Sequence, residues 1–221
     1  MYLSRLILNP RNRRVQKEIA NLYQLHRSLM NGFPDDLAEG NERVLFRLET
    51  HPRTGALTLL VQSLTLPDWS WLAEPGARGY LLPVDEPNPA VKSFDLRLTP
   101  GQTLAFRLRA NPTVKRRRED DDGHLRSVRD PLYREEDQHA WLDRKGEQGG
   151  FRVLQVNATR EGNVIAWQKK NNQRHKLTFF AVQFDGLLRV TDPDRLRETV
   201  QRGVGSGKGM GFGLLSLARP A

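Results

Sequence analysis

The sequence predicts an α+β protein made of two tandem ferredoxin-like (RRM-like) βαββαβ domains. Alternating segments typical of strands and periodic segments typical of helices follow one another in a similar order in both halves. The 221 residues, of which 38% are hydrophobic, are enough to form two small cores. Two βαββ-type units, each with a further helix and strand, are therefore the simplest architecture. We place the N-terminal domain at residues 1–99 and the C-terminal domain at residues 100–221.

In the first half, the sequence pattern predicts, in order, a strand, a helix, two strands, an irregular segment and a strand. The corresponding ranges are 2–9, 11–30, 44–50, 57–63, 67–89 and 94–98. Pro10 ends the first strand because proline lacks the N–H that a strand ladder uses. Leu22, Leu25 and Leu29 recur at spacings of three and four, which gives the helix one apolar face.

The second half predicts a strand, a charged loop, a helix, a strand, a β-hairpin, a strand, a helix, a glycine-rich loop and a closing strand. The ranges are 104–110, 115–123, 135–147, 151–156, 164–184, 187–190, a helix ending near 201, 203–213 and 214–217. Polar residues at 171–174 form the turn of the hairpin, and 185–186 form a second turn. Two glycines at 149–150 end the first helix, and Asp192 or Asp194 caps the second.

The charge balance predicts a polyanionic partner. Lys and Arg number 35 against 26 acidic residues, and clustered cations gain free energy by releasing the counterions of a nucleic acid. The alternative is a basic protein whose charges only face water. The absence of cysteine excludes disulfides, thiolate nucleophiles and thiolate zinc sites. With no signal peptide and no apolar run long enough to span a membrane, we expect a cytoplasmic protein without a membrane partner.

Basic residues gather in three groups that favour nucleic-acid binding. They are Lys115, Arg116, Arg117 and Arg118 in the charged loop, Lys169, Lys170, Arg174 and Lys176 around the hairpin turn, and Arg11, Arg13, Arg14, Lys17 and Arg27 on or near the first helix. Each group alone is also typical of a solvated surface, but three in one chain favour RNA or DNA. The sequence contains no convincing helix-turn-helix with a basic recognition helix, which disfavours a DNA-binding regulator.

Tyr23 and His26 are the candidate catalytic residues. They lie three residues apart in the predicted helix, so their side chains share one side of it, at the edge of the apolar face. An imidazole with a pKa near neutral and a phenol can together activate and steer a hydroxyl. The alternative is that the histidine makes a structural hydrogen bond and the tyrosine packs. We predict no metal site, because the spacing of His51, His124 and His139 resembles no zinc site.

Residues 203–213 contain six glycines at alternate positions. The segment differs from a nucleotide-binding loop, because Gly209 rather than Ser or Thr follows Lys208 and Arg202 occupies the position of the first glycine. Glycines permit close backbone approach and expose N–H groups to a phosphate, and neighbouring cations add charge. The alternative is a purely structural turn. The residues expected to bind RNA here are Arg202, Gly205, Gly207 and Lys208.

Five segments occur in an order and spacing that resemble one known family. They are LILNP at 6–10, NLYQLHR at 21–27, TLPDW at 65–69, FRLRANP at 106–112 and GVGSGKGMGFGLLS at 203–216. Together they resemble the CasE family of CRISPR-associated endoribonucleases, the Cascade subunits that process precursor CRISPR RNA (pre-crRNA). The resemblance implies two ferredoxin-like domains, cleavage of CRISPR repeat RNA at the base of its hairpin, and a mature crRNA that stays bound together with other Cascade subunits.

The same resemblance implies roles for particular residues. Tyr23 and His26 occupy the catalytic positions of the helix. The basic hairpin at 169–176 resembles the element that enters the major groove of the RNA stem, and the loop at 203–213 resembles the signature loop that packs near the RNA.

The implied reaction is attack of the RNA 2′-hydroxyl on the adjacent phosphorus, which needs no metal or cofactor because the nucleophile belongs to the substrate. His26 acts as general base or exchanges a proton with the leaving 5′-oxygen, and Tyr23 orients the nucleophile or the histidine. Asn31 stands where some relatives have lysine, so stabilisation of the phosphate falls to Arg27 or another cation. The alternative function is a non-catalytic hairpin RNA-binding protein of the same fold.

Overall fold

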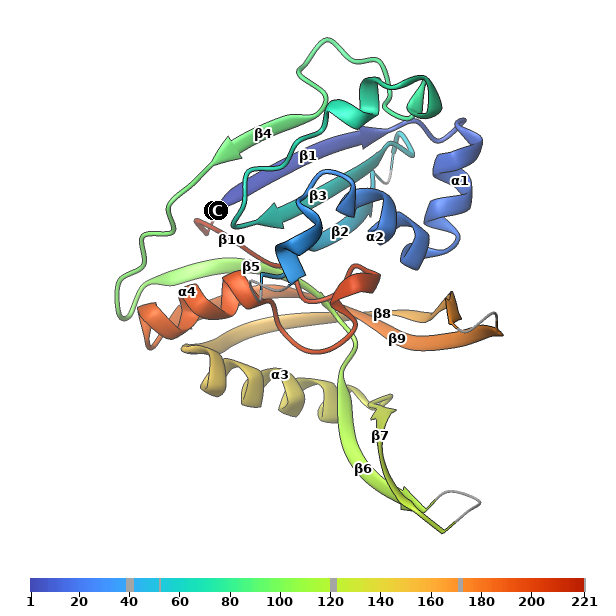
Figure 1. Cartoon of the computed structure of the whole chain (residues 1–221). Coiled ribbons are helices and arrows are strands. Elements are labelled where there is room, and N and C mark those ends of the chain that lie inside the picture. The colour runs from blue at the N-terminus through green and yellow to red at the C-terminus, as the bar shows by residue number, and fades with distance from the viewer. Residues whose placement is uncertain (39–41, 52, 120–122, 171–172, 221) are drawn as a thin grey trace.

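The computed structural model describes residues 1–38, 42–51, 53–119, 123–170 and 173–220 (Figure 1). Its strands are β1 (Tyr2–Leu8), β2 (Leu45–Thr50), β3 (Leu57–Ser63), β4 (Ala90–Ser93), β5 (Thr103–Ala110), β6 (Thr113–Glu119), β7 (Leu125–Pro131), β8 (Phe151–Lys170), β9 (Gln173–Val190) and β10 (Leu215–Ala218). Its helices are α1 (Arg13–Ile19), α2 (Leu22–Met30), α3 (Glu135–Gly149) and α4 (Pro193–Arg202). Four short 3₁₀ turns are η1 (Asp35–Ala38), η2 (Ser70–Ala73), η3 (Pro75–Ala77) and η4 (Lys208–Met210). None of the helices in the described ranges is long and apolar enough to cross a membrane.

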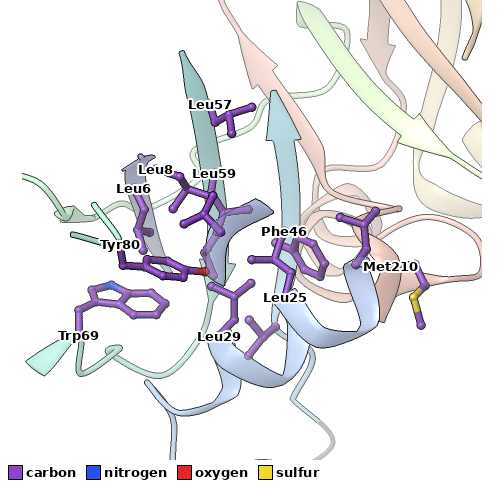
Figure 2. Close-up of a cluster of buried hydrophobic side chains, with 14 of the residues drawn as sticks. Leu6, Leu8, Leu25, Leu29, Phe46, Leu57, Leu59, Trp69, Tyr80 and Met210 are labelled. Atoms are coloured by element: carbon purple, nitrogen blue, oxygen red, sulfur yellow. The ribbon is translucent and has the colours of Figure 1, made fainter. Parts of the chain in front are cut away.

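The N-terminal sheet has the strand order β2-β3-β1-β4, and every neighbouring pair is antiparallel. This order, with the first and third strands at the centre, is that of a ferredoxin-like fold. α1 and α2 pack beside the sheet, while η2 and η3 take the place of a second helix (Figure 1). Leu6 of β1 lies opposite Leu59 of β3, and both are fully buried. Figure 2 shows Leu25 and Leu29 of α2 packed into this core.

The C-terminal sheet has the order β10-β5-β9-β8, again antiparallel throughout. When only the four strands of this sheet are counted, without β6 and β7, their order is the same as in the N-terminal sheet, so the prediction of two ferredoxin-like domains is confirmed. Trp141 of α3 stacks on Phe184 of β9, with Leu196 of α4 in the same buried cluster. β6 and β7 form a separate ribbon that projects away from both sheets (Figure 1). Residues 94–102 connect the sheets, and the domain division at 99 and 100 stays a proposal.

Two buried polar side chains link the halves. The guanidinium of Arg47 in β2 donates hydrogen bonds to the backbone oxygen of Leu214 at 3.2 Å and to Oγ of Ser216 at 3.0 Å. Nε2 of Gln62 in β3 donates to the backbone oxygen of Val200 at 2.6 Å. Because a buried donor left without a partner is costly, these bonds fix how the two sheets meet.

The glycine-rich segment of the second half completes the core of the first. Met210 and Phe212 belong to the same buried cluster as Leu25 and Phe46. Figure 2 shows Met210 at the edge of this cluster, on the side of Phe46 and away from Trp69. The loop at 203–213 is therefore held directly against the helix that carries the candidate catalytic residues.

Two expectations for the first half are wrong. The single helix expected at 11–30 is two helices, because Asn21 adopts the non-helical conformation φ −141°, ψ 87°. The strand expected at 94–98 lies instead at Ala90–Ser93, as β4. Since β1 begins at Tyr2, which is paired with Ser93, it offers little further strand for a longer β4 to pair with.

Three expectations for the second half are also wrong. The charged loop expected at 115–123 contains β6, whose strand character was hidden because its side chains are mostly exposed and show no apolar alternation. The turn expected at 185–186 is continuous strand within β9, and the two segments expected at 151–156 and 164–170 form the single strand β8. Gly186 is needed for close strand approach, because a Cβ there would collide with the backbone of Gln155.

Candidate active site and nucleic-acid interface

α2 carries the two candidate catalytic side chains. Leu25 and Leu29 are buried beneath it, while Tyr23 and His26 are half-buried at the edge of this apolar face, as the spacing predicted. Arg27 is exposed. Packing of the leucines fixes the rotation of the helix about its axis and so the direction of both side chains.

The imidazole of His26 lies in a tight, largely apolar environment. It stacks on Phe46 of β2 with ring centroids 6.0 Å apart and an interplanar angle of 11°. On another side is Gly209 of η4. Its Nδ1 is buried, and nothing in the described part of the chain hydrogen-bonds to it. Burial lowers the pKa of His26 below its ordinary value of 6.5, so the ring is neutral at pH 7 and can accept a proton.

Tyr23 is connected to the long hairpin formed by β8 and β9. Nε2 of Gln168 donates a hydrogen bond to the hydroxyl oxygen of Tyr23 at 3.4 Å. One residue before Gln168, the backbone of Trp167 exchanges two hydrogen bonds with the side chain of Asn21, both 3.1 Å long. These contacts hold the far end of the hairpin against the start of α2.

Glycines of the 203–213 segment pack against aromatic rings. Gly205 and Gly207 both have φ of +79°. A Cβ would come within 3.0 Å of the Trp141 ring at Gly205 and within 2.9 Å of the Phe212 ring at Gly207. Both positions therefore require glycine for the fold itself. Their expected role in RNA binding stays a prediction.

A cavity of about 600 Å³ lies between the β6–β7 ribbon, α3, α4 and the glycine-rich segment. The charged residues that line it are Lys115, Arg129, Lys145, Arg195, Arg202, Lys208 and a single acid, Glu198. Lys115 stands directly opposite Arg129 in the ribbon, a like-charge pairing that destabilises a sheet unless an anion is near. The pKa of Lys208 is lowered by burial and by the charges of Arg43, Lys145 and Arg202. The cavity is therefore suited to phosphate groups.

Only some of the predicted RNA-binding residues meet at this cavity. Lys115, Arg202, Gly205 and Lys208 line it, and Arg117 shares the Lys115 face of β6 by strand alternation.

Other predicted RNA-binding residues lie elsewhere. Arg116 and Arg118 face the opposite side of β6, where both approach Asp130 at 3.6 and 2.8 Å. Arg174 and Lys176 are exposed near the end of the β8–β9 hairpin, and Arg174 stacks over the Trp167 ring at 5.7 Å. The side chains of Lys169 and Lys170, and turn residues 171 and 172, lie outside the described residues.

Sequence reasoning missed several residues of the site. Arg129, Lys145 and Arg195 line the cavity from three separate elements, and none of them belongs to the three basic groups recognised in the sequence. Asn21 and Gln168 support Tyr23 from positions far apart in the chain. In the described ranges, no three His, Asp or Glu side chains group closely enough to hold a metal ion.

The chain matches known proteins along nearly its whole length. A family model described as CRISPR associated protein matches residues 1–219. The chain is 40% identical over 226 residues to the CRISPR-associated endoribonuclease Cse3 of Thermus thermophilus, covering 99% of this chain and 100% of that protein. It is 32% identical over 223 residues to the Cascade subunit CasE of Escherichia coli, covering 99% of each. A solved structure of the CRISPR endoribonuclease Cse3 bound to a 19-nt RNA superposes with a TM-score of 0.80 at 38% identity, covering 99% of this chain and 100% of that one.

Proposed function

The chain belongs to the CRISPR-associated protein family that includes Cse3 and CasE, and we propose that it is the endoribonuclease that processes CRISPR repeat RNA as a Cascade subunit. The names of the two relatives support the activity and the partner complex. The observation that carries the proposal is the contact between η4 and His26. It joins a neutral general base directly to the segment whose Lys208 lines a cationic cavity.

The proposed substrate is a hairpin RNA. The cavity suits phosphates of the stem, because six cationic side chains line it against one carboxylate. The end of the β8–β9 hairpin, with Arg174 and Lys176, is proposed to enter the major groove of the stem. Since this end contacts the start of α2, a stem held there brings the nucleotides at its base close to Tyr23 and His26.

The proposed reaction is a metal-independent transesterification. The 2′-oxygen forms a bond to the adjacent phosphorus as the bond from phosphorus to the 5′-oxygen breaks, giving a 2′,3′-cyclic phosphate and a free 5′-hydroxyl. Neutral His26 removes the proton of the 2′-hydroxyl, and the imidazolium that forms, or a water molecule, returns a proton to the leaving 5′-oxygen. Tyr23 directs a hydrogen bond to the reacting oxygens. Arg27, exposed beside His26, or Lys208, next to Gly209, stabilises the charge on the phosphate.

Retention of the product follows from the same charges. The phosphates of the stem are unchanged by cleavage at its base, so the cationic cavity binds the mature crRNA as it binds the precursor. We propose that the protein acts once on each RNA and then carries it into Cascade in the cytoplasm. The alternative, hairpin binding without cleavage, has the same cavity but gives His26 no chemical role.

The test is incubation of the purified protein with a labelled CRISPR repeat hairpin in excess EDTA, alongside His26→Ala. We expect one cut at the base of the stem by the wild type. His26→Ala is expected to lose cleavage while it binds the hairpin with unchanged affinity, which also shows that the variant is folded. Wild-type binding without a cut would support the non-catalytic alternative. Equal cleavage by His26→Ala would remove His26 from the reaction.

A further inference from the structure

We propose that Gln168 is a positioning residue that directs the hydroxyl proton of Tyr23 toward the RNA. The inference rests on the proposed function and adds a residue to it. Nε2 of Gln168 donates to the hydroxyl oxygen of Tyr23 at 3.4 Å. A phenol has one hydrogen to donate and lone pairs that accept. Because the amide occupies the acceptor side, the hydrogen of Tyr23 remains available for an oxygen of the substrate.

Two hydrogen bonds between Asn21 and Trp167, the residue before Gln168, hold the Gln168–Tyr23 contact in place. We call them the Asn21–Trp167 anchor. Asn21 precedes α2, a position where an asparagine side chain commonly caps the helix by accepting from its first N–H groups. Here it makes no capping bond. Its amide instead donates to the oxygen of Trp167 and accepts from the N–H of Trp167, both at 3.1 Å. This pair fixes β8 against the start of α2 and places the next residue, Gln168, opposite Tyr23.

The same anchor connects Tyr23 to the proposed RNA-binding surface of the hairpin. Trp167 pairs with Lys176 across the β8–β9 ladder, and Gln168 pairs with His175. Arg174 lies over the Trp167 ring. RNA that binds Arg174 and Lys176 therefore contacts the residues that neighbour the anchor. It holds the end of the hairpin in place, and Gln168 in that end orients the Tyr23 hydroxyl.

The experiment compares Gln168→Met and Gln168→Glu, each in the wild-type and in the Tyr23→Phe background. Methionine has a similar length but cannot donate the hydrogen bond. Glutamate reverses the direction of the hydrogen bond to Tyr23, because its carboxylate accepts the phenolic proton that the reaction needs. Single-turnover cleavage is measured at saturating protein, with hairpin affinity measured separately. Gln155→Glu, at an exposed glutamine of the same strand, is the same substitution away from Tyr23 and controls for the added negative charge.

We expect Gln168→Met to slow cleavage about threefold and Gln168→Glu about tenfold, with unchanged affinity for Gln168→Met. In the Tyr23→Phe background neither substitution is expected to slow cleavage further. Wild-type rates for both variants, or equal losses with and without the Tyr23 hydroxyl, would overturn the inference and leave the proposed function standing. A wild type that does not cut would overturn the proposed function and this inference with it.

Discussion

Gly209 lies against the imidazole of His26, and a Cβ added to the glycine would stand 3.2 Å from Cδ2 and 3.4 Å from Nε2 of that ring. The contact joins the glycine-rich segment to α2, two parts of the chain that lie nearly two hundred residues apart. It leaves the imidazole little room between η4 on one side and Phe46 on the other. The segment thus fixes the position of the proposed general base.

Gly209→Ala is predicted to slow cleavage about tenfold, because a general base displaced by a few tenths of an ångström loses its alignment with the 2′-hydroxyl. Hairpin affinity and the midpoint of urea unfolding should change little. The measurement is the single-turnover rate. Gly76→Ala is the matched control, since a Cβ at Gly76 meets nothing within 4 Å. Equal rates for the two variants would show that the contact does not position His26.

The protonation of His26 is predicted to depend on its burial. Burial lowers the pKa of this histidine below 6.5, so the unfolded chain binds a proton at this site before the folded protein does. The site's contribution to the free energy of unfolding is therefore complete above about pH 6.5 and is lost as the pH falls through the lowered pKa. An NMR titration of the free protein, with His26→Ala to assign the resonance, should give a midpoint below 6.5. A midpoint at or above 6.5 would contradict this environment.

The cationic cavity is predicted to contribute to the salt dependence of RNA binding. Each cation that neutralises a phosphate of the stem releases bound counterions, so its removal lowers the slope of log affinity against log salt by roughly one. Lys145→Ala and Arg129→Ala should each show this change in hairpin binding titrations between about 50 and 200 mM salt. Arg53→Ala, an exposed cation outside the cavity lining, should leave the slope unchanged. An unchanged slope for the first two variants would place the stem elsewhere.

The parts of the fold that could be predicted from sequence are those with a local periodic signal. Leu22, Leu25 and Leu29 define one face of α2, and that face places Tyr23 and His26 at its edge without knowledge of the rest of the chain. The succession of strands and helices likewise predicts two ferredoxin-like domains. The break at Asn21 was missed because nothing local marks it: the side chain makes no capping bond and instead bonds to Trp167, 146 positions away.

The rest of the site depends on convergence of distant segments. Arg129, Lys145 and Arg195 belong to a ribbon and two helices, and nothing near each of them in sequence indicates a shared cavity. The β6–β7 ribbon is mostly exposed, so it has no apolar alternation by which a strand is recognised. The glycines at 205 and 207 could be read as approaching a phosphate or a ring, and only the fold shows the rings.

In the proposed reaction, the RNA supplies its own nucleophile. The most direct test is a labelled repeat hairpin with a single 2′-deoxy substitution at the nucleotide before the cut, incubated with the wild-type protein in excess EDTA. The deoxy hairpin is expected to bind with nearly the affinity of the all-ribose hairpin and not to be cut at that position. Cleavage of the deoxy hairpin at that phosphate would rule out attack by the 2′-oxygen, because the attacking oxygen would then have to come from elsewhere.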